Sequence, residues 1–530
     1  MNSILPYQQA KEQLSLYEKI GQLFMPAAFI NDSEAEIIQI EKLIKEQHIG
    51  GLCFFHSRAS AATNFEGQKK IMYNEDSFST LKKLINRYQK IAKQPLLISI
   101  DAEWGLAMRI ENTPQYPYAI TLGAVQNSED LVFKVGKQIA NDCKSAGIYW
   151  NLAPVVDINN NPNNSVIGYR SFGENKNIVT EKALAFIKGS ESEGILTCLK
   201  HFPGHGDTAV DSHLGLPLIT KSKEELIKNE LYPFQQLINE GVDSIMAGHL
   251  SIPALADGDE IPSSLSKKML KDLLRDEMNF KGAVISDALN MHAVSKNYPI
   301  KGELEWLAFD AGNDILCFAE NIREGIQTIA QKATNEQIDT SFERIWKLKQ
   351  KAFKIDIQNK FELSKPDELN CSIAKKSLTL FSGNMSNFKK EPLIGIEIGK
   401  SKKSNFFETI AETISFNKII ASENTIETIQ KIVVTEKNIL FAIYPPKTKP
   451  ANYFDIPKEE IDLINELIQT KNVVIYLFGN PYVLNHIQTK KAKAVVIVYQ
   501  DFEVFQENAA LHFIGKNEAL GKIPVSINAI

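Results

Sequence analysis

Short apolar runs and amphipathic stretches alternate along the first 350 residues of the chain. The apolar runs have the length of strands, and the stretches between them have the period of helices. Strands that are apolar on consecutive positions and alternate with helices indicate a parallel sheet covered on both faces. The predicted strands are 23–29, 51–55, 95–101, 148–157, 196–202, 244–250, 282–289 and 314–318.

Eight such strands in succession are the number that closes a (β/α)8 barrel. The helical stretches between them support this prediction, and a long helix is expected over 339–353. A doubly wound open sheet gives the same local pattern, so the strand count alone leaves that alternative open. The helices predicted between the strands are 33–47, 79–93, 129–146, 179–193, 223–240 and 266–278.

A smaller α/β pattern follows the predicted barrel. A polar stretch that contains Pro366 has the composition of a linker. Beyond it, five apolar runs alternate with helical segments such as 458–469, which predicts an α/β sandwich. We therefore predict a TIM-type barrel domain over 1–353, a linker over 354–370 and an α/β sandwich domain over 371–530. The five predicted strands of the second domain are 393–398, 418–421, 439–444, 473–478 and 494–499.

Composition narrows the class of protein. Of the 530 residues 44% are hydrophobic and 23% are charged, and the formal net charge is −5. This balance supplies enough apolar surface for folded cores, which excludes a largely disordered chain. A small negative charge argues against a nucleic-acid partner. Apolar runs far shorter than the roughly 20 residues of a membrane span argue against a membrane partner.

The five cysteines are scattered and form no C-x-x-C pair, which argues against a disulfide framework and a zinc finger. The first residues show no basic stretch followed by an apolar one, so a cytoplasmic location is expected. A periplasmic or secreted protein whose export signal had been removed has the same appearance.

Polar side chains stand where five of the predicted strands end. These positions are Asp101, Asp157, Lys200 with His201, His249 and Asp287. The active sites of barrel enzymes lie at the carboxyl ends of the strands. Polar groups at the ends of five strands are therefore expected to converge on one pocket.

The stretch 200–213, K-H-F-P-G-H-G-D-T-A-V-D-S-H, concentrates three histidines and two aspartates. One interpretation is a polar surface loop. A second is a metal site, because His201 and His205 have the spacing of two ligands on one helix face. Proline and glycine oppose a helix there, but a loop with Asp207, Asp211 and His213 remains an alternative source of ligands.

A third interpretation is general acid–base chemistry. In an extended segment, residues i and i+2 point the same way, so Asp211 and His213 can pair while Ser212 points away. A carboxylate beside an imidazole fixes the tautomer of the ring and stabilises its protonated form. Such a dyad can give and accept a proton near neutral pH. It also needs a nucleophile or a positioned water.

Three aspartates at strand ends, Asp101, Asp157 and Asp287, have equal claims to the role of nucleophile. Aspartate is a weak strand former, so each position calls for a reason. For Asp287 the alternative is a structural one, the capping of a helix that begins near Ala288. Position alone does not choose among the three.

The stretch 200–213 resembles the signature of glycoside hydrolase family 3, in its β-N-acetylglucosaminidase branch. That branch carries K-H-F-P-G-H-G followed by D-S/T-H, and every position matches. The resemblance covers about residues 15 to 350 and continues more weakly beyond them. Further matching patches are 19–24, 151–157, 170–173 and 285–291.

The resemblance implies a retaining, exo-acting β-N-acetylglucosaminidase without a cofactor. Asp287 is then the nucleophile, and His213 paired with Asp211 is the acid–base. The implied substrates are peptidoglycan fragments or chitooligosaccharides with a terminal β-linked N-acetylglucosamine. The residues implied to hold the sugar are Asp101, Arg109, Arg170, Lys200 and His201.

The sequence departs from the family pattern after the third strand. Many members read D-x-E-G-G-R-V-x-R, whereas this chain has Trp104 in place of a glycine and Leu106 in place of an arginine. This puts the preference for the leaving group in doubt. The alternatives are a β-glucosidase or β-xylosidase, a metal-dependent hydrolase and a non-catalytic sugar-binding protein. Transfer of the sugar to phosphate is a minor hypothesis.

Overall fold

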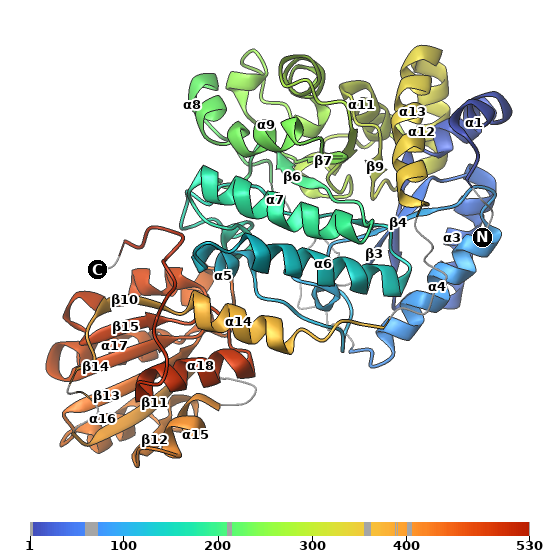
Figure 1. Cartoon of the computed structure of the whole chain (residues 1–530). Helices are drawn as coiled ribbons and strands as arrows, with labels where there is room; N and C mark the ends of the chain where they lie inside the picture. Colours follow the sequence, from blue (N-terminus) through green and yellow to red (C-terminus); the bar gives the residue numbers. More distant parts are fainter. Residues whose placement is uncertain are drawn as a thin grey trace. The chain divides into compact units, whose positions relative to one another are not determined.

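The computed structural model describes residues 4–58, 73–208, 215–354, 362–386, 388, 391–399 and 405–528. Contacts divide the chain into two compact units (Figure 1). The first comprises Met1–Tyr116, Val132–Ile158 and Ala183–Lys365, and the second comprises Pro117–Leu131, Asn159–Lys182 and Pro366–Ile530. No helix within the described ranges is long and apolar enough to cross a bilayer.

The first unit is built on short parallel strands. Hydrogen bonds join them as β2-β3-β4-β5, β6-β7-β8 and β1-β9. Their bounds are β1 (Phe24–Met25), β2 (Ala27–Phe29), β3 (Gly51–Phe55), β4 (Leu97–Ile100), β5 (Trp150–Asn151), β6 (Leu199–Phe202), β7 (Ser244–Ala247), β8 (Ala283–Ser286) and β9 (Leu316–Cys317).

Isolated bridges join the three groups of strands into a ring. Trp150 pairs with Leu196, just before β6, and Ile285 of β8 pairs with Ile315, just before β9. Only Pro26 separates β1 from β2, so these are two pieces of one strand. The eight strands therefore run in sequence order around a closed barrel, which confirms the predicted TIM-type fold over the open-sheet alternative.

Helices follow the barrel strands, and polar caps define several of their starts. Ser33 and Glu36 form a reciprocal capping box at α3, a motif that contributes about 1 kcal/mol. The stretch predicted as one helix over 223–240 is two helices, and 266–278 is a π-helical segment. The helices are α1 (Tyr7–Gln13), α2 (Leu16–Gly21), α3 (Glu34–Gln47), α4 (Ser77–Ile91), α6 (Glu129–Ala146), α7 (Lys176–Ser192), α8 (Lys223–Lys228), α9 (Leu231–Asn239), η5 (Lys268–Glu277), α10 (His292–Ser295), α11 (Glu303–Ala311), α12 (Ile322–Lys332) and α13 (Asn335–Ala352).

The second unit contains a six-stranded sheet in the order β10-β15-β14-β13-β11-β12. All neighbours are parallel except β10, which pairs antiparallel with β15. The prediction of five strands was wrong because β10 is a partly exposed edge strand that ends in turn-forming residues. The strands are β10 (Thr379–Gly383), β11 (Leu393–Gly399), β12 (Asn417–Ile420), β13 (Asn438–Tyr444), β14 (Asn472–Leu477) and β15 (Ala494–Ile497).

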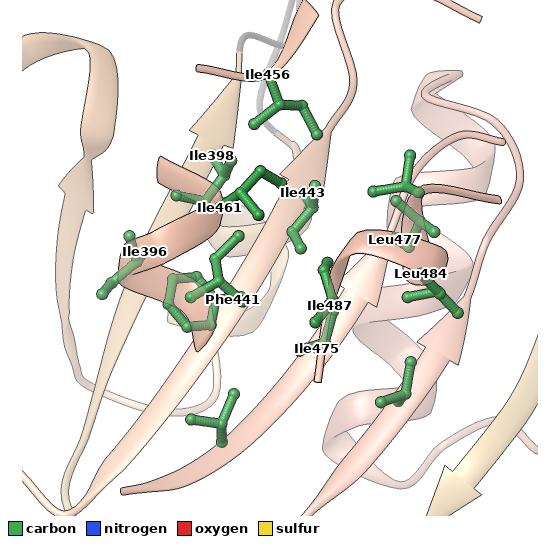
Figure 2. Close-up of a cluster of buried hydrophobic side chains, with 14 of the residues drawn as sticks. Ile396, Ile398, Phe441, Ile443, Ile456, Ile461, Ile475, Leu477, Leu484 and Ile487 are labelled. Atoms are coloured by element: carbon green, nitrogen blue, oxygen red, sulfur yellow. The ribbon is translucent and has the colours of Figure 1, made fainter. Parts of the chain in front are cut away.

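Helices lie on both faces of this sheet (Figure 1), and buried apolar side chains form a core between helices and sheet. Figure 2 shows Phe441 and Ile443 of β13 beside Ile396 of β11, Ile475 of β14 and Ile461 of α17. Burial of such a core gives about 25 cal/mol per Å² of apolar surface, so this unit has its own source of stability. The helices are α5 (Ala119–Ala124), α14 (Asp367–Ser377), α15 (Asn405–Ala411), α16 (Ile426–Val433), α17 (Lys458–Thr470) and α18 (Glu503–Ile514).

Helix α14 starts inside the stretch predicted as a linker, and residues 355–361 of that stretch lie outside the described residues. Two stretches of the predicted barrel domain, Pro117–Leu131 and Asn159–Lys182, group with the second unit. The domain limits drawn from the sequence stay a prediction.

Candidate active site

Lys200 links two carboxylates at the carboxyl ends of the barrel strands. It lies in β6, is 1% exposed, and places its Nζ 2.8 Å from Asp101 Oδ1 and 2.8 Å from Glu103 Oε1. Asp101 directly follows β4. A buried ammonium is costly unless it is paired. The two carboxylates therefore hold Lys200 in its charged form at one fixed place.

Arg109 forms an ion pair with the second carboxylate oxygen of Asp101. Its Nη2 donates to Asp101 Oδ2 at 2.8 Å, and its guanidinium lies 5.2 Å from the ring centre of Phe55. Burial alone raises the pKa of the Asp101 carboxyl, but the charges of Lys200 and Arg109 outweigh it and bring the pKa far below its usual range. Asp101 therefore stays ionised at any working pH.

A second group is assembled around Asp157. This carboxylate is fully buried and accepts hydrogen bonds from the backbone N–H of His201 (3.1 Å) and of His205 (2.7 Å). It also lies 2.8 Å from Nδ1 of the His201 ring. Burial raises the pKa of Asp157, but His201 and His205 together outweigh burial and bring the pKa below its ordinary value. Asp157 thus orients His201 and its loop.

The glycines of K-H-F-P-G-H-G let the backbone of this loop pass close to other parts of the chain. Gly204 has φ +124°, and a Cβ on Gly206 would lie 1.7 Å from the carbonyl oxygen of Ile158. No side chain fits at Gly206 without moving that strand end. Burial lowers the pKa of the adjacent His205 to about 4, so this ring is neutral at pH 7. Its Nδ1 lies 2.7 Å from Thr208 Oγ1.

Asp287 directly follows β8. Its backbone N–H donates to Ala247 O, and its Oδ1 accepts from the N–H of Ala288, both at 2.8 Å. The next helix, α10, begins at His292, so the interpretation of Asp287 as a helix cap was wrong. Burial raises the pKa of the Cys198 thiol to about 12, and the charges of Asp101 and Asp287 both act on that thiol. The two carboxylates therefore share one neighbourhood.

His249 follows β7 and is 0% exposed. Its Nδ1 lies 2.6 Å from Ser264 Oγ and its Nε2 lies 3.0 Å from Ala288 O. The ring thus contacts the residue that follows Asp287.

Four further polar residues were singled out in the sequence: Arg170, Asp207, Asp211 and His213. Arg170 ends the short turn η2 (Gly168–Arg170) of the second unit, where its Nη1 donates to Val166 O at 3.1 Å. Asp211 and His213 lie outside the described residues. Asp207 pairs with Lys221 at 2.8 Å. In the part of the chain that the structure describes, no three His, Cys, Asp or Glu side chains are grouped to hold a metal ion.

Two polar residues at this site were missed by the sequence analysis. Glu103 shares the ammonium of Lys200 with Asp101. Asn151 is fully buried and bonds both backbone groups of Ala102, at 3.0 and 3.1 Å, which fixes the turn after Asp101. The signal for Glu103 was its place two residues after Asp101, a spacing that puts both side chains on one side of an extended segment.

A closed parallel barrel with charged side chains gathered at the carboxyl ends of its strands defines the architecture of a barrel enzyme. The model for the glycosyl hydrolase family 3 N-terminal domain matches residues 15–348. The chain therefore belongs to glycosyl hydrolase family 3, which confirms the family predicted from the sequence.

Relatives with established names agree with this assignment. The chain is 34% identical over 347 residues to beta-hexosaminidase A of Pseudoalteromonas piscicida, across 59% of this chain and 55% of that protein. It is 28% identical over 345 residues to a beta-N-acetylglucosaminidase/beta-glucosidase of Cellulomonas fimi, across 63% of this chain and 57% of that protein. The chain thus spans little more than half the length of these two curated relatives.

A solved structure covers nearly the whole chain. It is that of a family 3 beta-N-acetylglucosaminidase from Paenibacillus sp. str. FPU-7, with a TM-score of 0.79 and 27% identity. The match covers 98% of this chain and 100% of that one. Both units of this chain therefore have counterparts in one known protein.

Proposed function

We propose that this protein is a retaining, exo-acting β-N-acetylglucosaminidase that releases terminal β-linked N-acetylglucosamine. The observation that carries the proposal is the ion-paired group of Asp101, Arg109 and Lys200 in the same neighbourhood as Asp287. Family membership and the names of the relatives support it. The D-S-H motif at 211–213 supplies the residue types of the acid–base.

The contacts of Asp101 and Asp157 argue against these two aspartates as the nucleophile, and the resemblance assigns that role to Asp287. Both oxygens of Asp101 are held by cations, and Asp157 is buried against three N–H groups. A carboxylate stabilised in this way is a poor nucleophile, because its charge is already compensated. Asp287 lies partly exposed at the end of its strand, as a group that attacks a bound sugar must, and its Oδ1 accepts the N–H of Ala288.

The proposed reaction is a double displacement. Asp287 attacks the anomeric carbon and forms a covalent glycosyl-enzyme while His213, oriented by Asp211, gives its proton to the leaving oxygen. The neutral His213 then takes a proton from water, which attacks the same carbon and frees Asp287. Two inversions leave the configuration of the sugar unchanged.

The charged group holds the sugar in this proposal. Each oxygen of Asp101 retains a lone pair for a sugar hydroxyl, while Lys200, Arg109 and His201 offer donors. Arg170 is assigned to the same sugar by the resemblance alone. Peptidoglycan fragments and chitooligosaccharides are the proposed natural substrates, and no cofactor takes part.

A panel of 4-nitrophenyl glycosides tests the proposal. We expect turnover of the β-N-acetylglucosaminide to exceed that of the β-glucoside and the β-xyloside, and NMR to show the β-anomer as the first product. A preference for the unsubstituted sugars would make the protein a β-glucosidase or β-xylosidase. An α-anomer as first product would exclude a covalent intermediate.

The proposed acid role of His213 has its own test. His213→Ala is expected to slow substrates with poor leaving groups more than activated aryl glycosides, because only the former need a proton. Equal losses on both kinds of substrate would remove the acid role. Release of free sugar alone in phosphate buffer, without the 1-phosphate, would dismiss phosphate as an acceptor.

A further inference from the structure

His249 is a buried residue in a hydrogen-bond chain that reaches Ala288, the residue after Asp287. Its ring contacts the hydroxyl of Ser264 on one side and the carbonyl oxygen of Ala288 on the other, at 2.6 and 3.0 Å. Its position at a strand end is compatible with two roles for His249: it can line the site or support the residues that do. These contacts favour support, because both ring nitrogens face protein groups.

The partners of the ring fix its protonation. A carbonyl oxygen only accepts hydrogen bonds, so Nε2 of His249 carries the proton that Ala288 O receives. In the neutral ring, Nδ1 then accepts from the Ser264 hydroxyl. Ser264 is itself anchored, since its N–H donates to Gly248 O at 3.1 Å and its carbonyl accepts from Asn313 Nδ2 at 2.7 Å. The ring is therefore held in one orientation and one tautomer.

The backbone on either side of Asp287 is held by different elements. Before it, the Asp287 N–H donates to Ala247 O at the end of β7. After it, Ala288 donates its N–H to Asp287 Oδ1 and receives the His249 Nε2–H on its carbonyl. The same carbonyl accepts the Met291 N–H at 3.0 Å, in a turn that precedes α10. His249 is thus the side chain that ties this turn to β7.

We infer that His249 is a positioning residue that fixes the carboxylate of Asp287 in the geometry for attack. The inference rests on the proposed function, in which Asp287 is the nucleophile. His249 acts through the backbone of Ala288, whose N–H orients the Asp287 carboxylate. Misplacing a reacting group by about 1 Å costs on the order of 100-fold in rate.

Three variants of His249 and one control measure this role. His249→Leu removes the donor to Ala288 and is expected to lower kcat by about 30- to 100-fold with KM nearly unchanged. His249→Gln retains an amide donor and is expected to restore most of this loss. His249→Phe, which also lacks a donor, should match Leu. His512→Leu removes another buried histidine, which bonds Tyr476 in the second unit, and should leave kcat unchanged.

The leaving group separates this role from proton donation. A displaced nucleophile slows aryl glycosides with good and poor leaving groups by the same factor, because proton transfer is unaffected. A loss in His249→Leu that grows as the leaving group worsens would assign His249 to proton donation and overturn the inference. Wild-type kcat in His249→Leu would overturn it as well.

If the His249 variants do not fold, Ser264→Ala tests whether the orientation of the His249 ring affects kcat, with the neighbouring Ser263→Ala as its control. The Ser263 hydroxyl donates to Leu250 O at 2.7 Å, whereas the Ser264 hydroxyl bonds the ring. We expect kcat to fall about threefold or more in Ser264→Ala alone, the loss of one hydrogen bond. Equal kcat in both serine variants would overturn the inference.

Asp287→Ala tests the proposed function separately. If that variant is active, Asp287 is not the nucleophile, whatever the His249 variants show.

Discussion

Two of the described lysines of the barrel unit are at most 1% exposed, and they lie at opposite ends of its strands. Lys200, at the carboxyl ends, is 1% exposed and lies between the carboxylates of Asp101 and Glu103. Lys349, on α13, is 0% exposed and bonds neutral groups at the amino ends, Gln22 Oε1 at 2.7 Å and Gly50 O at 3.1 Å. The same side chain is thus buried with charged partners at one end and with neutral partners at the other.

The different partners have different consequences. Burial lowers the pKa of the Lys349 ammonium to about 7, because no carboxylate offsets the loss of water. At the other end, Lys200 helps to hold the pKa of Asp101 far below its ordinary value, so both groups stay charged. Charge is concentrated where a polar substrate would bind. At the amino ends the buried lysine affects the stability of the fold instead, in keeping with the division of roles in such barrels.

Lys200→Met is expected to have the largest effect in this comparison. It leaves two carboxylates unpaired and removes a donor from the proposed sugar site, so kcat/KM should fall by about 100- to 1,000-fold, as for loss of a buried charge pair. Turnover of an aryl β-N-acetylglucosaminide measures the loss. Lys349→Met is the matched control, with expected wild-type kcat/KM. Similar kcat/KM values for the two variants would contradict the proposal that the lysine at the carboxyl ends of the strands serves the site and the lysine at the amino ends does not.

Glu103→Gln is expected to have an intermediate effect. The amide keeps the shape of the side chain but removes one of the two charges that hold Lys200, so kcat/KM should fall about tenfold. The control is Glu193→Gln, which weakens another carboxylate pair, with Lys144, away from the strand ends. If the two glutamate variants have equal kcat/KM, Glu103 has no share in the site.

Lys349→Met is expected to change the pH dependence of stability. Between pH 7 and about 10 the unfolded chain holds a proton on Lys349 that the folded protein has lost, so the free energy of unfolding rises with pH. Below pH 7 both states are protonated and this dependence ends. Between pH 6.5 and pH 8.5, the free energy of unfolding of the wild type should increase by about 1–2 kcal/mol more than that of Lys349→Met. Denaturant unfolding at the two pH values measures it, and equal gains would mean that Lys349 keeps an ordinary pKa.

Much of the barrel could be predicted from the sequence because its elements are encoded locally. The bounds of β3 and α6 were predicted as the structure has them, since an apolar run and an amphipathic period define them. The strand predicted over 148–157 is a regular strand only at Trp150–Asn151, and beyond Pro154, which lacks an N–H, an isolated bridge joins Val155 to Lys200. Strand β10 was missed because an edge strand has little apolar pattern to detect.

The pairs that form the site could not be predicted from local patterns. Lys200 and Asp101 are 99 residues apart, and only the closure of the barrel brings them together. Arg170 belongs to the second unit, and the sequence around it does not predict this. Strand-end position identified Asp101, Lys200 and Asp287, whereas the contacts that separate the three aspartates emerged only from the fold.

In the proposed mechanism, Asp287 becomes covalently bound to the sugar. A fluorinated N-acetylglucosaminyl donor that forms the intermediate faster than it is hydrolysed tests this claim directly, with peptide mass spectrometry of the treated protein. We expect one added sugar on the peptide that contains Asp287, and none in Asp287→Ala. An unmodified protein that has turned over the donor, or a sugar on a peptide with Asp101 or Asp157, would contradict it.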